Sequence, residues 1–231
     1  MAGNSNVDRI YTDIKQMASR FDIKPNEKLN EAAMAKRLGA SRTPLREALN
    51  RLVSEGFLTF ETGRGFFGRS LTAEKTLDMY QAREAIECKL VELTCERATD
   101  EELAALKEYT LECENAYDNT GDNSGTDSYL IEFDEGFHMG IAELSQNLEL
   151  IRMLDNLNVR MRYVREIDLE KSRIKTPDSH MDILEAIIAR DSKTASTKMR
   201  SHIYHSNDGA TEAVRKAYAR IYVPDEDRKN R

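Results

Sequence analysis

The sequence predicts a mainly α protein, with a small N-terminal module of three helices and a β-hairpin followed by an all-α antiparallel helical bundle of six or seven helices. Over most of the chain, apolar residues recur at the three- and four-residue spacing of helices. Two short apolar runs, "FLTF" and "GFFG", flank the tetrapeptide "ETGR" and are typical of a hairpin. Beyond Thr72 every pattern is helical, so we expect two domains, residues 1–72 and 73–231.

The module is expected to begin with two helices, the second of them short. Apolar side chains at helical spacing predict one over residues 7–20, and Asn30 is a suitable N-cap for another that ends at Leu38. Gly39 follows, as glycine commonly does just past a helix C-terminus. Between these helices, Pro25 and Asn26 predict a turn.

The third helix begins in "GASRTPLREAL". We expect it to start with Thr43 as N-cap and Pro44 at the first helical position, and to reach Glu55. Two short helices joined by a glycine-containing turn form a helix-turn-helix, and the hairpin that follows is then its wing.

Several local patterns mark helix boundaries in the C-terminal body. The run "TDEE", which starts at Thr99, is a capping-box pattern, and Thr176 with Pro177 is a good helix start. Residues 118–128 are expected to form a polar loop that contains glycine. Later helices are expected over residues 129–144, 147–169, 176–189, 191–206 and 208–222.

Charge is distributed unevenly along the chain. The whole chain has a formal net charge of -7, but residues 1–71 hold 12 basic and 8 acidic side chains, a net charge of +4, which leaves -11 for the remainder. Phosphate binding depends on the local field, so a mildly basic module on an acidic body is compatible with a nucleic-acid partner.

Cysteine content and hydrophobic patterning indicate the cellular compartment. The three cysteines, Cys88, Cys95 and Cys113, are odd in number and form no CxxC pair, so we expect free, buried thiols in a reducing cytoplasm. No apolar run approaches the length of a membrane span, and the N-terminus lacks a signal-peptide pattern. The sequence therefore predicts a cytoplasmic protein with no membrane partner.

The helix-turn-helix predicts a DNA-binding surface. In this motif the second helix enters the major groove, where its N-terminal residues meet phosphates and bases. Ser41 and Thr43 can donate hydroxyl hydrogen bonds to phosphate, and Arg42 and Arg46 can reach phosphate or a guanine edge. Arg64, at the glycine-rich hairpin tip, suits the adjacent minor groove. The alternative is that the arginines of the helix only solvate its end and pair with nearby acids.

A second constellation lies among the four histidines, which are His138, His180, His202 and His205. Asp134 and His138 are four residues apart and share one helix face. Three imidazoles and a carboxylate suit a divalent ion such as zinc, nickel or manganese. Spacing alone leaves the alternative that each histidine is a core or surface residue, and either His202 or His205 can face inward.

The stretch "GASRTPLREALNRLVSEGFLTFETGRGFFGR" resembles the winged helix-turn-helix of GntR-type bacterial transcription regulators. The preceding "IKPNEKLNEAAMAKRL" is similar to their usual approach to it, except that Asn26 stands where they usually have glycine. Asparagine tolerates a left-handed turn, so we expect little consequence. The helical body resembles the FCD effector domain of the FadR subfamily. The resemblance implies that operator DNA is contacted by Ser41, Arg42, Thr43, Arg46, Gly63 and Arg64.

The same resemblance implies a metal site in the body. FCD domains of this type bind a metal through one aspartate and three histidines, in contexts that match "DEGFH", "HMDILEAI" and "MRSH". Zinc is the leading candidate for the ion, and His205 is left outside the ligand set. The matching residues are Asp134, His138, His180 and His202.

Arg83, in "YQAREAIE", has two interpretations. It stands where the family usually has arginine followed by glutamate, and a guanidinium facing a cavity would bind a carboxylate in bidentate fashion. The alternative is an intrahelical pair with Glu87 at i+4. Weaker candidates for the ligand site are Arg162, Tyr163, Arg165 and Asn207.

Together these features predict a dimeric, ligand-responsive bacterial transcription regulator that binds double-stranded operator DNA and is not an enzyme. By resemblance it is expected to be a repressor released by a small carboxylate or sugar-acid effector at the metal. One alternative is a metal-dependent hydrolase with a DNA-binding appendage, although Glu135 is expected to point to another face than the metal ligands. The other is a constitutive regulator whose metal is purely structural.

Overall fold

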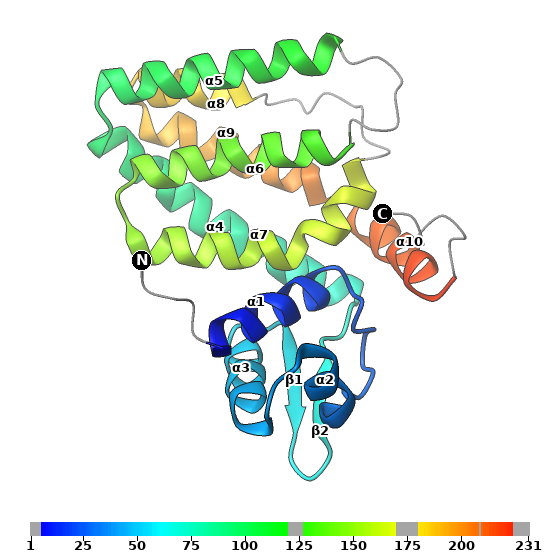
Figure 1. The fold of residues 1–231 in the computed structure, drawn as a ribbon. Helices are drawn as coiled ribbons and strands as arrows, with labels where there is room; N and C mark the ends of the chain where they lie inside the picture. The colour runs from blue at the N-terminus through cyan, green and yellow to red at the C-terminus, as the bar shows by residue number, and fades with distance from the viewer. Residues whose placement is uncertain (1–5, 120–126, 170–179, 208, 224–231) are drawn as a thin grey trace. The chain divides into compact units, whose positions relative to one another are not determined.

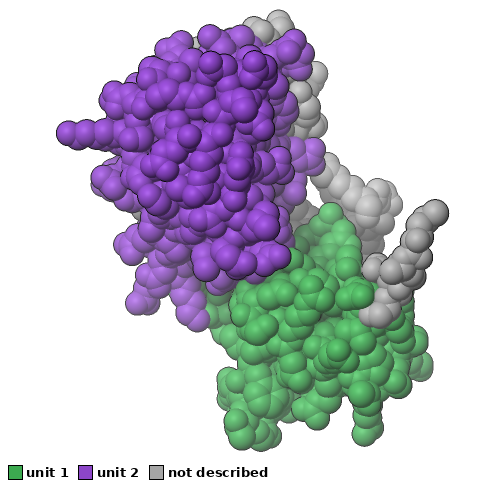
Figure 2. All heavy atoms as spheres, turned by 90° about the vertical axis from the view of Figure 1, so that its left-hand side faces the viewer, with its two compact units in different colours: residues 1–72, 216–231 green, residues 73–215 purple. Residues whose placement is uncertain are grey.

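The computed structural model describes residues 6–119, 127–169, 180–207 and 209–223 (Figure 1). The chain divides into two compact units, shown in green and purple in Figure 2. Unit 1 comprises residues 1–72 together with residues 216–231, and unit 2 comprises residues 73–215.

Unit 1 contains the three predicted helices and the predicted hairpin. Ile10 and Ile14 on one face of the first helix are fully buried, as are Leu45 and Leu49 of the third helix, which packs against it. Burying such side chains stabilises a fold by roughly 1.5–3 kcal/mol each. The elements are α1 (Asn6–Ser19), α2 (Glu31–Leu38), α3 (Arg42–Ser54), β1 (Leu58–Glu61) and β2 (Gly65–Gly68).

The two predicted caps of α2 are confirmed. The Asn30 side chain accepts a hydrogen bond from the Ala33 amide at 3.0 Å. Gly39 closes the helix in the left-handed conformation, with a φ of 59°. These local signals fix both ends of the first helix of the helix-turn-helix.

The predicted start of α3 is wrong. The helix begins at Arg42, so Ser41 rather than Thr43 is the N-cap, and Pro44 lies within the first turn instead of at the first helical position. Proline needs no amide partner anywhere in the first turn, so its presence does not fix which residue comes first.

The hairpin forms the predicted wing. β1 and β2 pair antiparallel, from Leu58 opposite Gly68 to Glu61 opposite Gly65. At the tip, Gly63 and Gly65 have φ values of 77° and 100°, which favour glycine at both positions.

Asn26 takes the left-handed turn conformation expected of it, with a φ of 60°. Its amide donates a hydrogen bond to the Gly68 carbonyl at 3.0 Å, and the Leu29 amide donates to the Phe66 carbonyl at 2.8 Å. These bonds attach the loop between α1 and α2 to β2.

Unit 2 is a helical bundle arranged around its first helix, α4 (Ala73–Arg97), which packs against α6, α7, α8 and α9 (Figure 1). With α10 (Ala210–Tyr222), the described residues after Thr72 hold seven helices, within the predicted six or seven. None of the described helices is both long and apolar enough to cross a membrane. The other helices are α5 (Asp100–Asn119), α6 (Asp127–Leu144), α7 (Leu148–Leu169), α8 (His180–Ile188) and α9 (Ser192–Asn207).

Helix boundaries in unit 2 lie close to the predicted ones. The capping box is present: the Glu102 amide donates to the Thr99 hydroxyl at 3.2 Å, and the Thr99 amide donates to the Glu102 carboxylate at 2.8 Å. Helices α5 and α6 both reach into the predicted loop 118–128, whose remaining residues lie outside the described ranges. The predicted helix start at Thr176 and Pro177 also lies outside them, and the described part of α8 begins at His180.

The last turns of α10 group with unit 1, although the sequence suggested one domain from residue 73 to residue 231. The Tyr222 hydroxyl donates a hydrogen bond to the Pro25 carbonyl at 3.2 Å, and the Lys24 ammonium lies 5.1 Å from the centre of the Tyr222 ring. Both contacts fall within unit 1.

Cys88, Cys95 and Cys113 are buried and form no disulfide among the described residues, as expected. Burial raises the pKa of the Cys88 and Cys95 thiols. These side chains therefore act as small apolar core residues.

Candidate functional site

The four predicted metal ligands lie together inside unit 2. Asp134 and His138 project from α6 one turn apart, His180 is the first residue of α8, and His202 belongs to α9. Each residue offers one ligand atom, and these atoms all lie within 4.8 Å of one another. His138 and His202 are buried, and the other two side chains are partly exposed.

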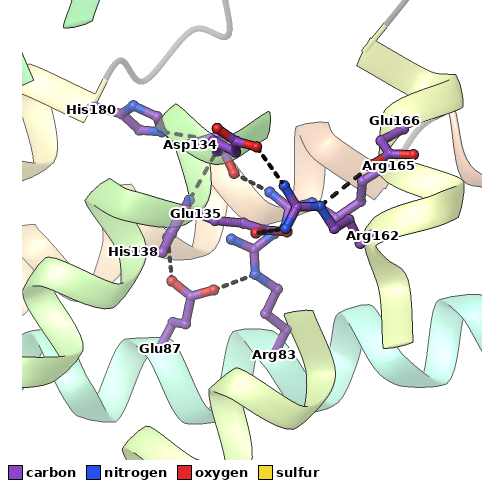
Figure 3. A network of polar contacts seen from close by, with 10 residues as sticks. Arg83, Glu87, Asp134, Glu135, His138, Arg162, Arg165, Glu166 and His180 are labelled. Atoms are coloured by element: carbon purple, nitrogen blue, oxygen red, sulfur yellow. Dashed lines mark hydrogen bonds and ion pairs between the residues drawn. The ribbon is translucent and has the colours of Figure 1, made fainter. Parts of the chain in front are cut away.

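Asp134 faces two of the imidazoles. Its Oδ1 atom lies 3.7 Å from Nε2 of His138 and 3.4 Å from Nε2 of His180 (Figure 3). The His202 ring centre lies 5.2 Å from that of His138 and 4.8 Å from that of His180. The Phe137 ring stacks on the His180 ring, with 4.1 Å between the ring centres, and so supports that imidazole.

The donor set fits a divalent metal ion. The Nε2 atoms of His138 and His180 are buried and make no hydrogen bond to the described residues. Buried polar atoms without partners are uncommon in folded proteins. Zinc–nitrogen and zinc–oxygen distances are about 2.0–2.2 Å, so an ion bound among atoms that lie within 4.8 Å of one another would draw the four side chains inward. Zinc, nickel and manganese all suit three imidazoles and a carboxylate.

A buried charged network surrounds His138. Its Nδ1 atom contacts Oε2 of Glu87 on α4, and Oε1 of the same carboxylate accepts a hydrogen bond from Nε of Arg83 (Figure 3). All three side chains are at most 2% exposed. Burial opposes the charge on Glu87, but Arg83 and His138 outweigh it and lower the pKa of Glu87 to about 2. Burial opposes the charge on His138 as well, but Glu87 outweighs it and the pKa of His138 is raised.

Arg165 of α7 holds the other oxygen of Asp134. Its Nη2 atom donates to Oδ2, so Oδ1 remains directed at the imidazoles. Burial disfavours a charged Asp134, but Arg165, followed by His138, keeps the pKa of Asp134 well below its usual range.

Glu135 belongs to the same polar network through the arginines of α7. Among the described residues its ion pairs are with these arginines rather than with the candidate metal ligands, in line with the expectation that it points to another face. Its carboxylate lies 3.7 Å from Nη1 of Arg165 and 3.4 Å from Nη1 of Arg162, because α7 presents both guanidiniums to α6. Burial raises the pKa of Glu135 in spite of these two cations.

The predicted ligand-binding residues have different surroundings. Arg83 is buried and pairs with Glu87, as one of its two interpretations predicted, and its Nη2 atom makes no hydrogen bond to the described residues. Tyr163 is buried, whereas the side chains of His205 and Asn207 lie outside the described part of the chain. Arg162 is partly exposed and lies 3.4 Å from each of three carboxylates, those of Glu132, Glu135 and Glu166.

Two contacts were missed from the sequence, Glu87 with His138 and Arg165 with Asp134. The first joins residues 51 positions apart and the second joins residues 31 positions apart, so no local spacing relates them. A weaker signal existed for Glu87, which shares a helix face with the buried Leu90 and Thr94. A charged residue on an apolar face calls for a buried partner.

The predicted DNA-binding residues of α3 lie at its exposed N-terminal end. Ser41, Arg42, Thr43 and Arg46 are all exposed. Arg46 forms an ion pair with Glu31 of α2 at 3.4 Å, so pairing with a nearby acid is present in the free chain. Exposed pairs of this kind are worth about 0–1 kcal/mol, and phosphate can therefore replace the carboxylate.

Arg64 lies at the wing tip between two glycines. It pairs with Glu61, and its guanidinium lies 5.1 Å from the centre of the Phe67 ring. The side chain is well exposed, so it remains available to a polyanion.

Comparison with known families and proteins covers most of the chain. Residues 6–67 match the family of bacterial regulatory proteins called gntR, and residues 78–205 match the FCD domain. The Nta operon transcriptional regulator of Aminobacter aminovorans is 37% identical over 211 residues, which cover 91% of this chain and 97% of that protein. The HTH-type transcriptional repressor GlaR of Escherichia coli K12 is 30% identical over 204 residues, which cover 84% of this chain and 90% of GlaR.

Solved structures share the fold. E. coli McbR/YncC superposes with a TM-score of 0.58 at 24% identity, over 94% of this chain and 97% of that one. A putative GntR transcriptional regulator from Rhodococcus sp. RHA1 superposes with a TM-score of 0.61 at 19% identity, over 94% of this chain and 99% of that one. The chain therefore belongs to the GntR family: it is a DNA-binding transcriptional regulator with a helix-turn-helix region in residues 6–67 and an FCD domain in residues 78–205.

Proposed function

We propose that this regulator is a cytoplasmic homodimeric repressor that senses a small carboxylate or sugar acid at a divalent metal ion in its FCD domain. The observation that carries the proposal is the cluster of Asp134, His138, His180 and His202, whose ligand atoms lie within 4.8 Å of one another. We propose zinc as the ion, with nickel and manganese as the other ions that these ligands suit. When bound, the ion supplies a Lewis-acidic anchor for an anion.

The charges around the cluster favour an anionic effector. Arg83 and Arg165 are buried cations, and Glu87, Asp134 and Glu135 are their anionic partners when ionised. These five groups carry one surplus negative charge, which a divalent ion converts to one surplus positive charge. A carboxylate would compensate that charge in surroundings where an unpaired charge is costly.

The DNA-binding half of the proposal rests on two-fold symmetry. Each winged helix-turn-helix would bind half of a near-palindromic operator, and the second protomer would supply the other half. Effector and operator then compete through the conformation of the protein, and each lowers the affinity for the other by the same factor. Typical couplings of this kind are about 1–3 kcal/mol. The proposed contact residues are Ser41, Arg42, Thr43, Arg46, Gly63 and Arg64.

One relative supports repression rather than activation of transcription. GlaR, which is 30% identical to this chain, is named a transcriptional repressor. The three buried cysteines of the described chain form no disulfide, which suits a reducing cytoplasm. We therefore propose repression as the direction of regulation, with release by the effector.

The test is thermal unfolding of metal-free and Zn²⁺-loaded protein with a panel of monocarboxylates, dicarboxylates and sugar acids. An effector at a hundred times its dissociation constant should add about 2.7 kcal/mol of stability, and only in the loaded protein. The active compound is then titrated into protein bound to an operator selected from random DNA, where it should release the protein. Light scattering checks that the bound species is a dimer.

Three results would contradict the proposal. Chelation that lowers the melting temperature while no carboxylate acts in either sample would indicate a structural metal in a constitutive regulator. Turnover of esters or phosphates by the loaded protein, lost in His180→Ala, would indicate a hydrolase. A monomer on a single half-site would exclude the two-fold arrangement.

A further inference from the structure

The two ring nitrogens of His138 face different groups. Nδ1 contacts Oε2 of Glu87, and Nε2 lies 3.7 Å from Oδ1 of Asp134, inside the cluster of candidate ligands (Figure 3). In a neutral imidazole one nitrogen carries the proton, and the group bonded to it decides which nitrogen is left for a metal. An ionised carboxylate only accepts hydrogen bonds. Glu87 therefore places the proton on Nδ1 and leaves the lone pair of Nε2 for the ion.

Glu87 is itself held from its other side. Oε1 accepts the hydrogen bond from Nε of Arg83, so each carboxylate oxygen has its own partner. The contact with Arg83 in the same buried region fixes the orientation of the carboxylate, so Oε2 stays directed at Nδ1 of His138.

We propose that Glu87 is a positioning residue of the metal site, which orients the His138 ring so that Nε2 faces the ion, and that Arg83 acts through Glu87. This inference rests on the proposed metal site and goes beyond its four ligands. It also gives Arg83 a role other than direct contact with the effector. Carboxylates that accept from a metal-ligating histidine commonly account for about 10–100-fold in metal affinity.

The test compares metal binding by the full-length wild type and by Glu87→Gln. Metal-free protein competes with a chromophoric chelator, first for Zn²⁺ and then for Ni²⁺. Glutamine keeps the shape of the side chain and removes its charge, so we expect affinity to fall about 10–100-fold. Glu92→Gln is the matched control, because Glu92 is on the same helix, is partly exposed and pairs with Lys89 at 3.0 Å. Its affinity should equal that of the wild type.

A second variant keeps the test decisive if Glu87→Gln folds poorly. The double variant Arg83→Met, Glu87→Gln removes both charges of the buried pair together, so neither charge is left buried without its partner. Circular dichroism and thermal unfolding without metal identify the folded variants. We expect the folded double variant to bind Zn²⁺ about 10–100-fold more weakly than the wild type.

The outcomes separate this inference from the proposed function. If folded variants keep wild-type affinity for Zn²⁺ and only their metal-free melting temperature falls, Glu87 is merely structural and the inference is overturned. If the wild type itself binds neither ion, the metal site fails and the inference fails with it.

Discussion

Nε2 of His180 lies 3.4 Å from Oδ1 of Asp134, and the same oxygen lies 3.7 Å from Nε2 of His138. One carboxylate oxygen thus faces imidazoles from two helices, α6 and α8. An ion held among these atoms would connect the two helices, so metal binding should appear as stability of the FCD domain as well as affinity.

Substituting His180 with alanine is expected to abolish stabilisation by Zn²⁺. For the wild type, free Zn²⁺ at a hundred times its dissociation constant should raise the free energy of unfolding by about 2.7 kcal/mol. Urea unfolding with and without Zn²⁺ measures the difference. His202→Ala should behave like His180→Ala, and His205→Ala should behave like the wild type. If His205→Ala loses stabilisation by Zn²⁺ and His202→Ala keeps it, then His205 rather than His202 binds the ion.

Arg165→Met is expected to destabilise the metal-free protein by about 3–5 kcal/mol, because removing one partner of a buried pair leaves the other charge uncompensated. The Asp134 side chain is 20% exposed, which favours the lower end of that range. Urea denaturation without metal gives the value. Arg152→Met is the control, since both members of the Arg152–Glu149 pair are 72% exposed and such pairs contribute about 0–1 kcal/mol. Equal losses in the two variants would mean that the Asp134–Arg165 contact does not form in solution.

Acid should weaken the metal-free protein through Glu87. The pKa of Glu87 is lowered from 4.5 to about 2 on folding, so its stabilising contribution is complete above pH 4.5 and is lost as the pH falls toward 2. The contribution of Asp134 to stability is also lost as the pH falls, because folding lowers its pKa as well. The free energy of unfolding, measured in urea from pH 6 to 3, should therefore fall less steeply in the double variant Arg83→Met, Glu87→Gln. Parallel profiles for variant and wild type would contradict the charged state assigned to Glu87.

Local patterns predicted the framework of the protein well. Asn30, Gly39 and the Thr99–Glu102 capping box each act within three or four residues, and the structure has all of them. The start of α3 was missed because Ser41 and Thr43 are both good caps, and Pro44 is compatible with either. Local sequence signals alone therefore do not decide between these two starts of the helix.

In the candidate site, too, only the residues related by local spacing could be predicted from the residue pattern itself. Asp134 and His138 share a helix face by spacing, but the approach of His180 and His202 depends on how α8 and α9 pack. The family resemblance identified those two residues. It did not predict the contact of Glu87 with His138, because that contact joins two helices. The contact forms because an unpaired charge is costly to bury.

The last prediction concerns the DNA-binding surface. Arg46 lies near the N-terminus of α3, is exposed, and pairs with Glu31 only through a solvent-exposed contact at 3.4 Å. If Arg46 reads a base, Arg46→Ala should weaken binding to the selected operator by about 1–3 kcal/mol and leave binding to random DNA nearly unchanged. If it contacts phosphate alone, the affinities for operator and for random DNA should fall alike. The slope of log affinity against log salt concentration should then decrease in magnitude by about one. Fluorescence anisotropy at several salt concentrations separates these two roles, and Arg152→Ala, in a solvent-exposed pair of the FCD domain, is the control. Wild-type affinity of Arg46→Ala on both DNAs would remove Arg46 from the interface.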